Sequence, residues 1–288
     1  MRIWKCGRFD LPLGRKTYVM GILNVTPDSF SGDGTNSDLA TALYRAQEMV
    51  KDGADILDIG GESTRPGAAP VLAEEEARRV VPLVQQLAAQ IDVPISVDTT
   101  KSVVAREALV AGASIINDIS GATFDADMLR VLGASDCGCV LMHLRGTPQA
   151  MGWSARAGIE DSADVIEEIK IFWAERVAAA HTAGVARERI ALDAGFGFGK
   201  SLEENLEILR RGRDLSQFGF PTLSGTSRKS TIGKVLDGAP VDERQWGTAA
   251  TVALAVASGC DMVRVHDVRE MAQVARMSDA IVRQETCD

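Results

Sequence analysis

The sequence has little of what would mark a membrane, secreted or nucleic-acid-binding protein. No apolar run reaches the roughly 18 residues that a membrane span requires, and the first residues lack the apolar stretch of a signal peptide. Lysines and arginines are not clustered, and the formal net charge is −9. These absences argue against a nucleic-acid groove or an anionic membrane surface as partner. We therefore expect a cytoplasmic protein that acts on a small molecule.

Cysteine and histidine are also scarce. The five cysteines contain no Cys-x-x-Cys pair, which predicts free thiols in a reducing compartment. Cys137 and Cys139 flank Gly138 in an apolar run, so we expect both of them in the core. The three histidines are far apart and no His-Glu-x-x-His pattern is present. The spacing therefore does not predict a zinc site.

Short apolar runs alternate with longer amphipathic segments along the whole chain. Continuous apolar runs of this length are typical of strands buried on both faces, and the chain is near the usual size of one (β/α)8 barrel. We predict a single α/β domain over residues 1–288, a (β/α)8 TIM barrel with a short N-terminal extension or hairpin over its floor. An open doubly wound sheet is the alternative. The expected strands are Tyr18–Asn24, Asp55–Gly60, Ile95–Asp98, Ser114–Asn117, Gly138–His143, Arg189–Asp193, Pro221–Ser224 and Met262–His266.

Helical periodicity fills the intervals between these strands. Three of the expected helices are followed directly or closely by a glycine, which is a common stop signal. Pro82 interrupts a fourth, around Glu74–Gln90, and predicts a kink or a restart. The last two helices carry apolar and small residues that could form an interface. The helices meant here are Ser37–Asp52, Lys101–Ala111, Asp161–Thr182, Asp242–Ser258 and Val268–Arg283.

Nearly every expected strand ends in a polar residue or a glycine-rich turn. In a (β/α)8 barrel these ends converge on one mouth, where such groups are typical of an active site. A single strand-end Asp could instead cap a helix, but eight coincidences of that kind are improbable. The positions are Asn24, residues 60–66, Asp98, Asn117 with Asp118, His143, Asp193, residues 224–230 and residues 264–267.

The order of these motifs resembles the dihydropteroate synthase family from about residue 17 to the end. The segments that carry the resemblance are residues 24–31, 58–67, 96–99, 116–118, 142–143, 193–200, 225–230 and 264–268. The resemblance implies a barrel enzyme of folate biosynthesis. It would condense 6-hydroxymethyl-7,8-dihydropterin diphosphate with p-aminobenzoate to give 7,8-dihydropteroate and diphosphate. A homodimer and a Mg2+ cofactor are implied as well.

A reduced pterin offers N–H donors along one edge, which a carboxylate accepts well. We expect Asp193 to bind that edge, with Asp98 and Asn117 at further ring nitrogens. Lys229 would donate to the ring carbonyl, and Met142 would pack on the ring face unless it is ordinary core. Other interpretations are a helix cap for Asp98, a turn residue for Asn117 and a surface lysine for Lys229.

The diphosphate leaving group needs its charge neutralised as the carbon–oxygen bond breaks. Arg264 and His266 alternate along the last strand and should point the same way, although a salt bridge from this pair to a helix is an alternative. Asn24 would supply an oxygen ligand to Mg2+, and Thr64 could add a hydroxyl. The expected catalytic residues are Asp98, Lys229, Arg264 and His266.

For p-aminobenzoate, the resemblance implies that Ser230 and Lys229 help to hold the carboxylate. Phe30, Arg65 and Pro66 lie in the first two strand–helix loops and would close over this substrate. Three departures from the family pattern are Ala194, where Pro is common, the order of residues 31–34 in the first loop, and the stretch 149–161.

Three other functions remain open on the sequence. One is a non-catalytic pterin-binding paralogue. Another is a methyltetrahydrofolate–corrinoid methyltransferase domain, and the third is a Schiff-base aldolase that uses Lys229.

Overall fold

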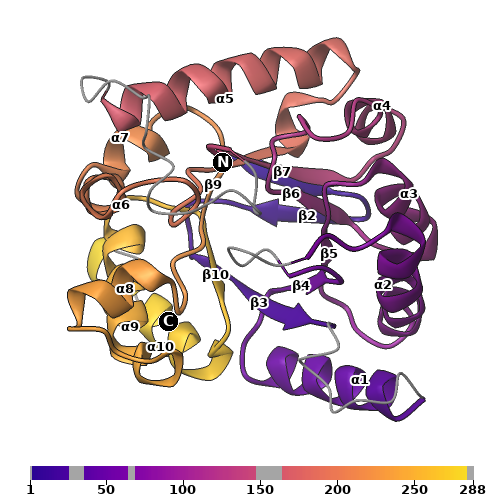
Figure 1. Cartoon of the computed structure of the whole chain (residues 1–288), viewed down its shortest axis with the longest axis horizontal. Helices are drawn as coiled ribbons and strands as arrows, with labels where there is room; N and C mark the ends of the chain where they lie inside the picture. Colours follow the sequence, from indigo (N-terminus) through magenta and orange to yellow (C-terminus); the bar gives the residue numbers. More distant parts are fainter. Residues whose placement is uncertain (1, 26–35, 64–68, 147–163, 284–288) are drawn as a thin grey trace.

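The computed structural model describes residues 2–25, 36–63, 69–146 and 164–283. Within these ranges, eight parallel strands close into a barrel in the order β10-β3-β4-β5-β6-β7-β8-β9, with helices around the outside (Figure 1). Pairing of the last strand with β3 closes the sheet and excludes the open doubly wound alternative. The strands are β3 (Tyr18–Asn24), β4 (Ile56–Gly60), β5 (Ile95–Asp98), β6 (Ile115–Asp118), β7 (Gly138–Met142), β8 (Ile190–Asp193), β9 (Thr222–Ser224) and β10 (Met262–Val265).

The helices occupy the predicted intervals, and the start of the expected helix Asp242–Ser258 is the 3-10 turn η4 (Val241–Glu243). Helix α2 (Ala73–Ala88) runs through Pro82 without a restart. Pro82 is exposed, and water can satisfy a carbonyl on the solvent side of a helix. The other helices are α1 (Asn36–Lys51), α3 (Ser102–Ala111), α4 (Met128–Gly133), α5 (Val165–Thr182), α6 (Leu202–Arg210), α7 (Gly212–Ser216), α8 (Ser230–Val235), α9 (Gln245–Ala257) and α10 (Val268–Val282), with 3-10 turns η3 (Arg187–Arg189) and η4 (Val241–Glu243).

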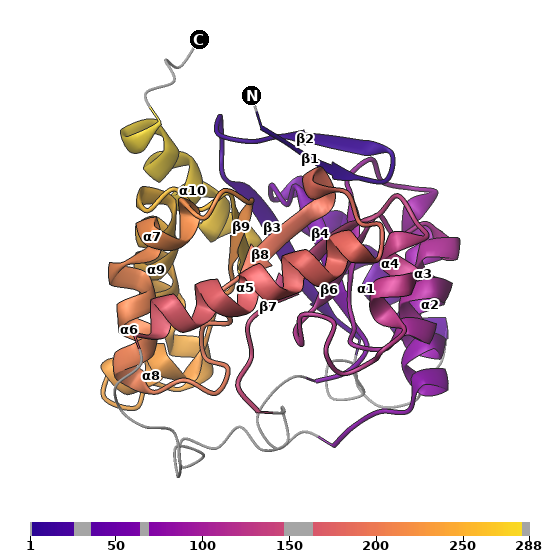
Figure 2. The same cartoon turned by 90° about the horizontal axis from the view of Figure 1, so that it is seen from above.

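The N-terminal residues form the predicted hairpin, β1 (Ile3–Cys6) paired antiparallel with β2 (Phe9–Pro12). Figure 2 shows it across one end of the barrel, opposite the end at which α8 begins. Trp4 is fully buried there, and its indole N–H donates to the Arg189 carbonyl at 3.0 Å. The hairpin packs on the first residues of the strands in one apolar cluster, which includes Trp4, Cys6, Leu11, Leu13, Met20, Ile56, Ile115, Val140, Ala191, Leu223 and Met262.

Side chains on the same face of a strand recur at every second position, and this period separates the two ends of the barrel. In several strands a floor residue of the apolar cluster is followed two positions later by a polar residue at the mouth. The pairs are Ile56 and Asp58, Ile115 and Asn117, Ala191 and Asp193, and Met262 and Arg264. The same strands thus supply an apolar layer below and the polar layer of the mouth above it.

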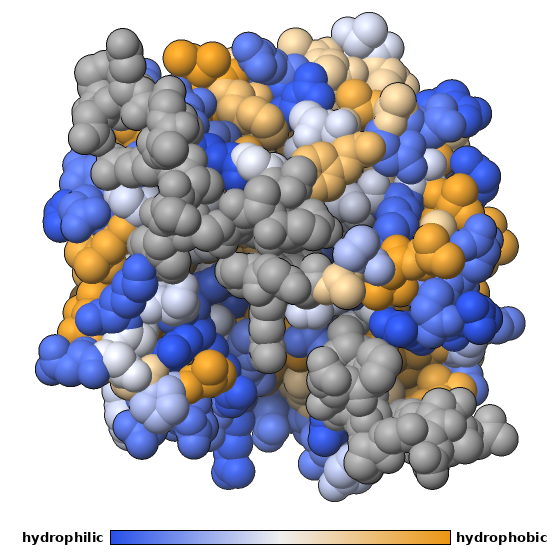
Figure 3. All heavy atoms as spheres, in the orientation of Figure 1, coloured by the Kyte–Doolittle hydropathy of each residue, from blue (hydrophilic) through white to orange (hydrophobic). Residues whose placement is uncertain are grey.

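The remaining expectations concern thiols and membranes. The four cysteines in the described part of the chain, Cys6, Cys137, Cys139 and Cys260, are free as predicted. All four are buried, which was predicted for Cys137 and Cys139. Burial raises the pKa of the Cys139 thiol well above its ordinary value. None of the helices in the described ranges is long and apolar enough to cross a bilayer. On the face seen in Figure 3, hydrophilic side chains surround separate small apolar patches.

Candidate active site

A pocket lies at the carboxyl ends of the strands. It brings together all five residues predicted to bind a pterin. Its lining comes from strands β5, β6, β7, β8 and β10 and from the loops after β6, β8 and β9. Phe30, Thr64, Arg65, Pro66 and the stretch 149–161 lie outside the described residues. The pocket is lined by Asp98, Asn117, Ile119, Met142, Asp193, Phe196, Phe198, Gly225, Lys229 and Arg264.

Arg264 is held by two acids inside the barrel. Its Nε donates to Asp58 Oδ2 at 2.6 Å, and one terminal nitrogen donates to Asp98 Oδ2 at 2.8 Å. Arg264 thus pairs with residues of β4 and β5 and does not form the alternative salt bridge to a helix. Asp98 does not cap α3, because the N-cap residue of that helix is Lys101. Burial raises the pKa of Asp98 to about 7, while Arg264 acts in the opposite direction.

Asp58 is the main residue that sequence reasoning did not assign. Its side chain is fully buried, and Oδ2 also accepts a hydrogen bond from the Asn117 amide at 3.2 Å. Its other oxygen has no partner among the described residues. The sequence did contain a signal for this residue. Asp58 is the acidic residue of an otherwise apolar, buried strand, Ile56–Gly60, and a buried charge is retained only when it is paired.

Asp193 ends β8 with its carboxylate in the pocket. Oδ1 accepts the Gly195 N–H at 2.6 Å, and the Trp173 indole donates to the Asp193 carbonyl at 3.2 Å. Burial raises the pKa of this carboxyl, with the Gly195 hydrogen bond and then Lys229 opposing the shift. The backbone and carboxylate of Asp193 are therefore both fixed before a ligand binds.

The apolar side of the pocket is a small cluster separate from the main core. It consists of Ile119, Met142 and Phe198, with Leu144 packed against it. Met142 is buried in this cluster and lines the pocket. This placement favours the predicted contact with a ring face over a role in the general core.

Lys229 lies in the pocket and is not a solvated surface lysine. Its Nζ is 3.8 Å from the centre of the Phe198 ring. Burial lowers the pKa of Lys229 to about 8, and the positive charge of Arg264 lowers it further, while Asp193 and Asp98 act against this. The ammonium is thus close to titration at physiological pH.

His266 contacts Ser227 in the loop after β9, and neither residue is among those that line the pocket. The Ser227 hydroxyl lies 3.0 Å from His266 Nδ1 and accepts the His266 backbone N–H at 3.2 Å. Burial lowers the pKa of His266 to about 3, and Arg264 and Arg228 add to the shift. His266 is therefore neutral at pH 7. Ser230 is exposed and is the first residue of α8.

Asn24 lies at the same end of the barrel, beside β4. A Cβ on Gly60 would come within 3.3 Å of Asn24 Oδ1 and 3.7 Å of the Asp98 Cβ. Gly60 therefore packs closely against the Asn24 amide, next to Asp98. No group of three His, Cys, Asp or Glu side chains that could hold a metal occurs in the described ranges.

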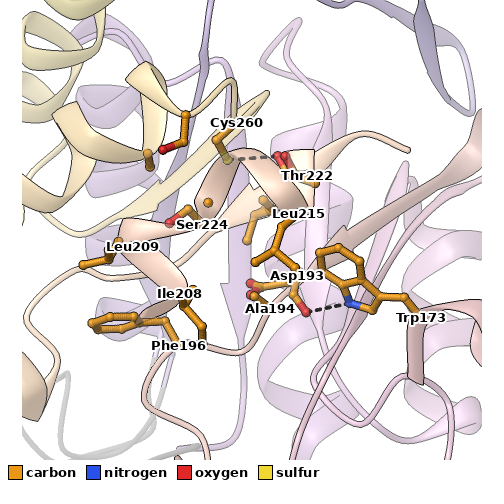
Figure 4. A pocket seen from close by; sticks show the side chains of 14 residues that line it. Trp173, Asp193, Ala194, Phe196, Ile208, Leu209, Leu215, Thr222, Ser224 and Cys260 are labelled. Carbon is orange, nitrogen blue, oxygen red and sulfur yellow. Dashed lines mark hydrogen bonds between the residues drawn. The ribbon is translucent and has the colours of Figure 1, made fainter. Parts of the chain in front are cut away.

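A second cavity lies behind β8 and β9, between the barrel wall and the outer helices (Figure 4). Its walls come mainly from α6, α7 and α9 together with the two strands. Asp193 and Phe196 line both this cavity and the pocket at the mouth. One polar atom in its wall, Thr222 Oγ1, has no partner in the described part of the chain.

The site combines a carboxylate, an amide and a lysine around one apolar face, with an arginine at its edge. The family described as "Pterin binding enzyme" matches residues 20–266, so the fold and the site are those of a pterin-binding barrel enzyme. A dihydropteroate synthase of Synechocystis sp. is 50% identical over 270 residues, which is 94% of this chain and 92% of the relative. The chain belongs to the dihydropteroate synthase family.

Solved structures agree with this assignment. A dihydropteroate synthase from Clostridium difficile, determined in the presence of pteroic acid, aligns with a TM-score of 0.87 at 46% identity. The alignment covers 94% of this chain and 98% of the other. The Burkholderia cenocepacia enzyme, complexed with 7,8-dihydropteroate, aligns with a TM-score of 0.86 at 39% identity and covers 99% of both chains.

Proposed function

We propose that this chain joins the methylene carbon of 6-hydroxymethyl-7,8-dihydropterin diphosphate to the amino nitrogen of p-aminobenzoate, releasing diphosphate, in folate synthesis. The observation that carries the proposal is the convergence of Asp193, Asn117, Lys229 and Arg264 on one pocket. The similar Burkholderia cenocepacia enzyme was solved with 7,8-dihydropteroate, the product of this reaction.

The pterin edge would be read by groups that are already ordered. The Gly195 N–H occupies only one acceptor position of Asp193, so the carboxylate can still accept two N–H bonds from the aminopyrimidinone. Asn117 offers both a donor and an acceptor to the next ring positions, and the Lys229 ammonium would donate to the ring carbonyl. The ring face would lie on Met142 and Phe198, which belong to the apolar cluster.

Arg264 would bind the diphosphate in a fixed orientation. A guanidinium has five N–H donors, and Asp58 and Asp98 take one each, so three remain for phosphate oxygens. The neutral His266 would add a hydrogen bond and not a charge. Since the two acids partly offset its charge, Arg264 alone does not neutralise diphosphate, and a divalent cation would help.

The residues at the mouth fit Mg2+ in the role of that cation. Mg2+ keeps several waters and binds through one or two protein oxygens plus substrate phosphates. The amide oxygen of Asn24, at the end of β3, is a ligand of this kind, and Asn24 would hold the ion. When bound, Mg2+ would stabilise the charge that develops on the departing diphosphate.

The bond changes need no protein nucleophile. The carbon–oxygen bond breaks first, diphosphate leaves, and the neutral amino nitrogen of p-aminobenzoate then attacks the methylene carbon and loses a proton. Asp98 and Asp193 would stabilise the positive charge on the pterin during this step. Ser230 and Lys229 would hold the p-aminobenzoate carboxylate. The predicted residues Phe30, Arg65 and Pro66 would close over this substrate, with Phe30 and Pro66 as apolar walls for its ring.

Diphosphate release in the presence of Mg2+ and p-aminobenzoate tests the proposal. We expect diphosphate release that is coupled to dihydropteroate formation. Lys229→Ala should lose this activity. Lys170→Ala is the control and should retain it, because Lys170 pairs with Glu167 on the surface of α5. No release despite pterin binding would instead indicate a non-catalytic paralogue. Methyl transfer from methyltetrahydrofolate would indicate the corrinoid-dependent reaction, and borohydride trapping at Lys229 would indicate an aldolase.

We also propose a homodimer, formed through α9 and α10 in the cytoplasm. Large apolar side chains are exposed on both helices: Trp246 is 82% exposed, Leu254 53%, Met277 64% and Ile281 66%. Exposed apolar patches of this kind mark interaction surfaces. Light scattering should give a dimer for the wild type and a monomer for Trp246→Glu combined with Ile281→Glu. A monomeric wild type would contradict the proposal.

A further inference from the structure

Lys200 is a buried cation that the reaction does not use. Only 5% of the residue is exposed, and its ammonium forms no ion pair with an acid among the described residues. It donates instead to three backbone carbonyls: Gly195 at 2.9 Å, Phe198 at 3.2 Å and His143 at 3.4 Å. Burying a lysine carries a desolvation cost, so a residue that only filled space here would be apolar.

The three carbonyls converge because of the turn that follows β8. Gly195, Gly197 and Gly199 all have positive φ, a conformation that glycine adopts without strain. The turn also packs too closely for a side chain, since a Cβ on Gly195 would be 1.9 Å from the His143 carbonyl oxygen. Asn205 fixes the other side by accepting the Gly197 N–H at 2.6 Å. The Lys200 ammonium lies where these three carbonyl oxygens converge.

The turn supports one side of the pterin pocket. Phe198 lines the pocket and lies beneath the Lys229 ammonium. Gly197 packs against the stem of the same lysine, because a Cβ there would be 3.2 Å from Lys229 Cδ. His143 directly follows Met142, which lines the pocket from β7. The three hydrogen bonds of Lys200 therefore connect the β7 and β8 walls of the pocket beneath its apolar face.

We infer that Lys200 is a positioning residue, which holds the glycine-rich turn against the end of β7 and thereby places Phe198 and Lys229 for pterin binding. This inference deepens the proposed function and rests on it. Burial lowers the pKa of Lys200 to about 7, and the charged and neutral amines both carry N–H donors. The charged amine has one N–H donor for each of the three carbonyls and the neutral amine has two, so two of the three hydrogen bonds persist when the proton is lost.

The chain contains a matched control at the opposite end of β8. Arg189 is also buried and donates to three backbone carbonyls, those of Leu132, Ser135 and Gly184. It precedes β8 on the floor side, whereas Lys200 follows β8 at the mouth. Arg189→Met and Lys200→Met therefore remove the same kind of interaction and differ in which end of the barrel they affect.

Binding of 6-hydroxymethylpterin and steady-state kinetics with both substrates test the inference. For Lys200→Met we expect the Kd of the pterin and the KM of the pterin diphosphate to rise about tenfold or more. The KM of p-aminobenzoate should stay within about threefold, and Arg189→Met should leave all three values near those of the wild type. An unchanged pterin Kd in Lys200→Met, or an equal rise in Arg189→Met, would overturn the inference. Absence of diphosphate release by the wild type would count against the proposed function alone, because the pterin Kd is measured without turnover.

A second variant covers the case in which Lys200→Met does not fold. Lys200→Gln keeps N–H donors without the charge and should bind pterin more tightly than the methionine variant, if that variant can be measured. Phe198→Leu, made alone and together with Lys200→Gln, gives a double-mutant cycle on the pterin Kd. Non-additive effects are expected if Lys200 acts through the turn. Strictly additive effects would contradict that route.

Discussion

The two ends of the barrel are built from the same strands but differ in the residues that they bury. At the floor, the hairpin packs Trp4 and Leu11 onto an apolar layer that contains Ile56 and Met262. At the mouth, two positions further along their strands, Asp58 and Arg264 form a buried ion pair. Burial of apolar surface stabilises the fold, whereas buried charges generally do not. The comparison indicates that the floor supplies stability and the mouth supplies chemistry.

The largest expected effect at the mouth comes from Asp193→Asn. The amide would lose two charge-assisted hydrogen bonds to the pterin, which are worth roughly 1.5–3 kcal/mol each. We therefore expect kcat/KM for the pterin diphosphate to fall by about 100-fold or more. The matched floor variant is Asp261→Asn, because Asp261 also accepts a backbone N–H, from Thr222 at 3.1 Å. Steady-state kinetics should separate the two variants, and an equal loss of activity in both would break the comparison.

The largest expected effect at the floor comes from Trp4→Ala. Removing a fully buried indole should lower the free energy of unfolding by about 3–5 kcal/mol. Urea denaturation measures this loss. At a temperature where the variant is folded, both KM values should match those of the wild type. A change in pterin KM without a loss of stability would mean that the hairpin influences the pocket directly.

Arg264→Lys should have an intermediate effect. Lysine cannot bond to Asp58 and Asp98 in the forked geometry of the guanidinium, so about 1.5–3 kcal/mol of charged hydrogen bonding is lost. We expect the inhibition constant for diphosphate, measured as a product inhibitor, to rise by roughly 10- to 100-fold. The floor control is Arg2→Lys, because Arg2 pairs with Asp261. This variant should leave the inhibition constant unchanged. Equal inhibition constants in wild type and Arg264→Lys would remove Arg264 from the diphosphate site.

The smallest effect is a pH dependence confined to the mouth. Burial lowers the pKa of Lys229 to about 8, so the lysine is charged below that pH and loses its proton above it. kcat/KM for the pterin diphosphate should therefore decline as pH rises through about 8, by up to about tenfold per pH unit. Lys229→Arg should lose this decline, because arginine stays protonated. A decline that persists in Lys229→Arg would assign the titration to another group.

The barrel itself could be predicted because each strand is a local pattern. The expected and observed strands agree to within one residue at each end, and Asn24, Asp98 and Asp193 do end their strands. The apolar run and its polar end both lie within a few consecutive residues. Such patterns can be recognised from the sequence without any knowledge of the tertiary structure.

The pairing of charges could not be predicted in the same way. Arg264 is 206 positions from Asp58 and 166 from Asp98, and only closure of the barrel brings these three residues together. Phe198 and Lys200 were part of the glycine-rich motif and received no role of their own. Their contacts depend on the path of the turn, which three left-handed glycines determine.

The indole of Trp173 gives the pocket a built-in optical probe. It is almost completely buried and donates to the backbone of the residue whose carboxylate would bind the pterin. Of the other three tryptophans, Trp4 lies at the far end of the barrel, Trp246 is exposed on α9, and Trp153 lies outside the described residues. Pterins absorb where tryptophan emits, so a bound pterin would quench Trp173 by energy transfer. Ligand occupancy could then be followed in real time, with Trp173→Phe as the reference for emission from the other three tryptophans.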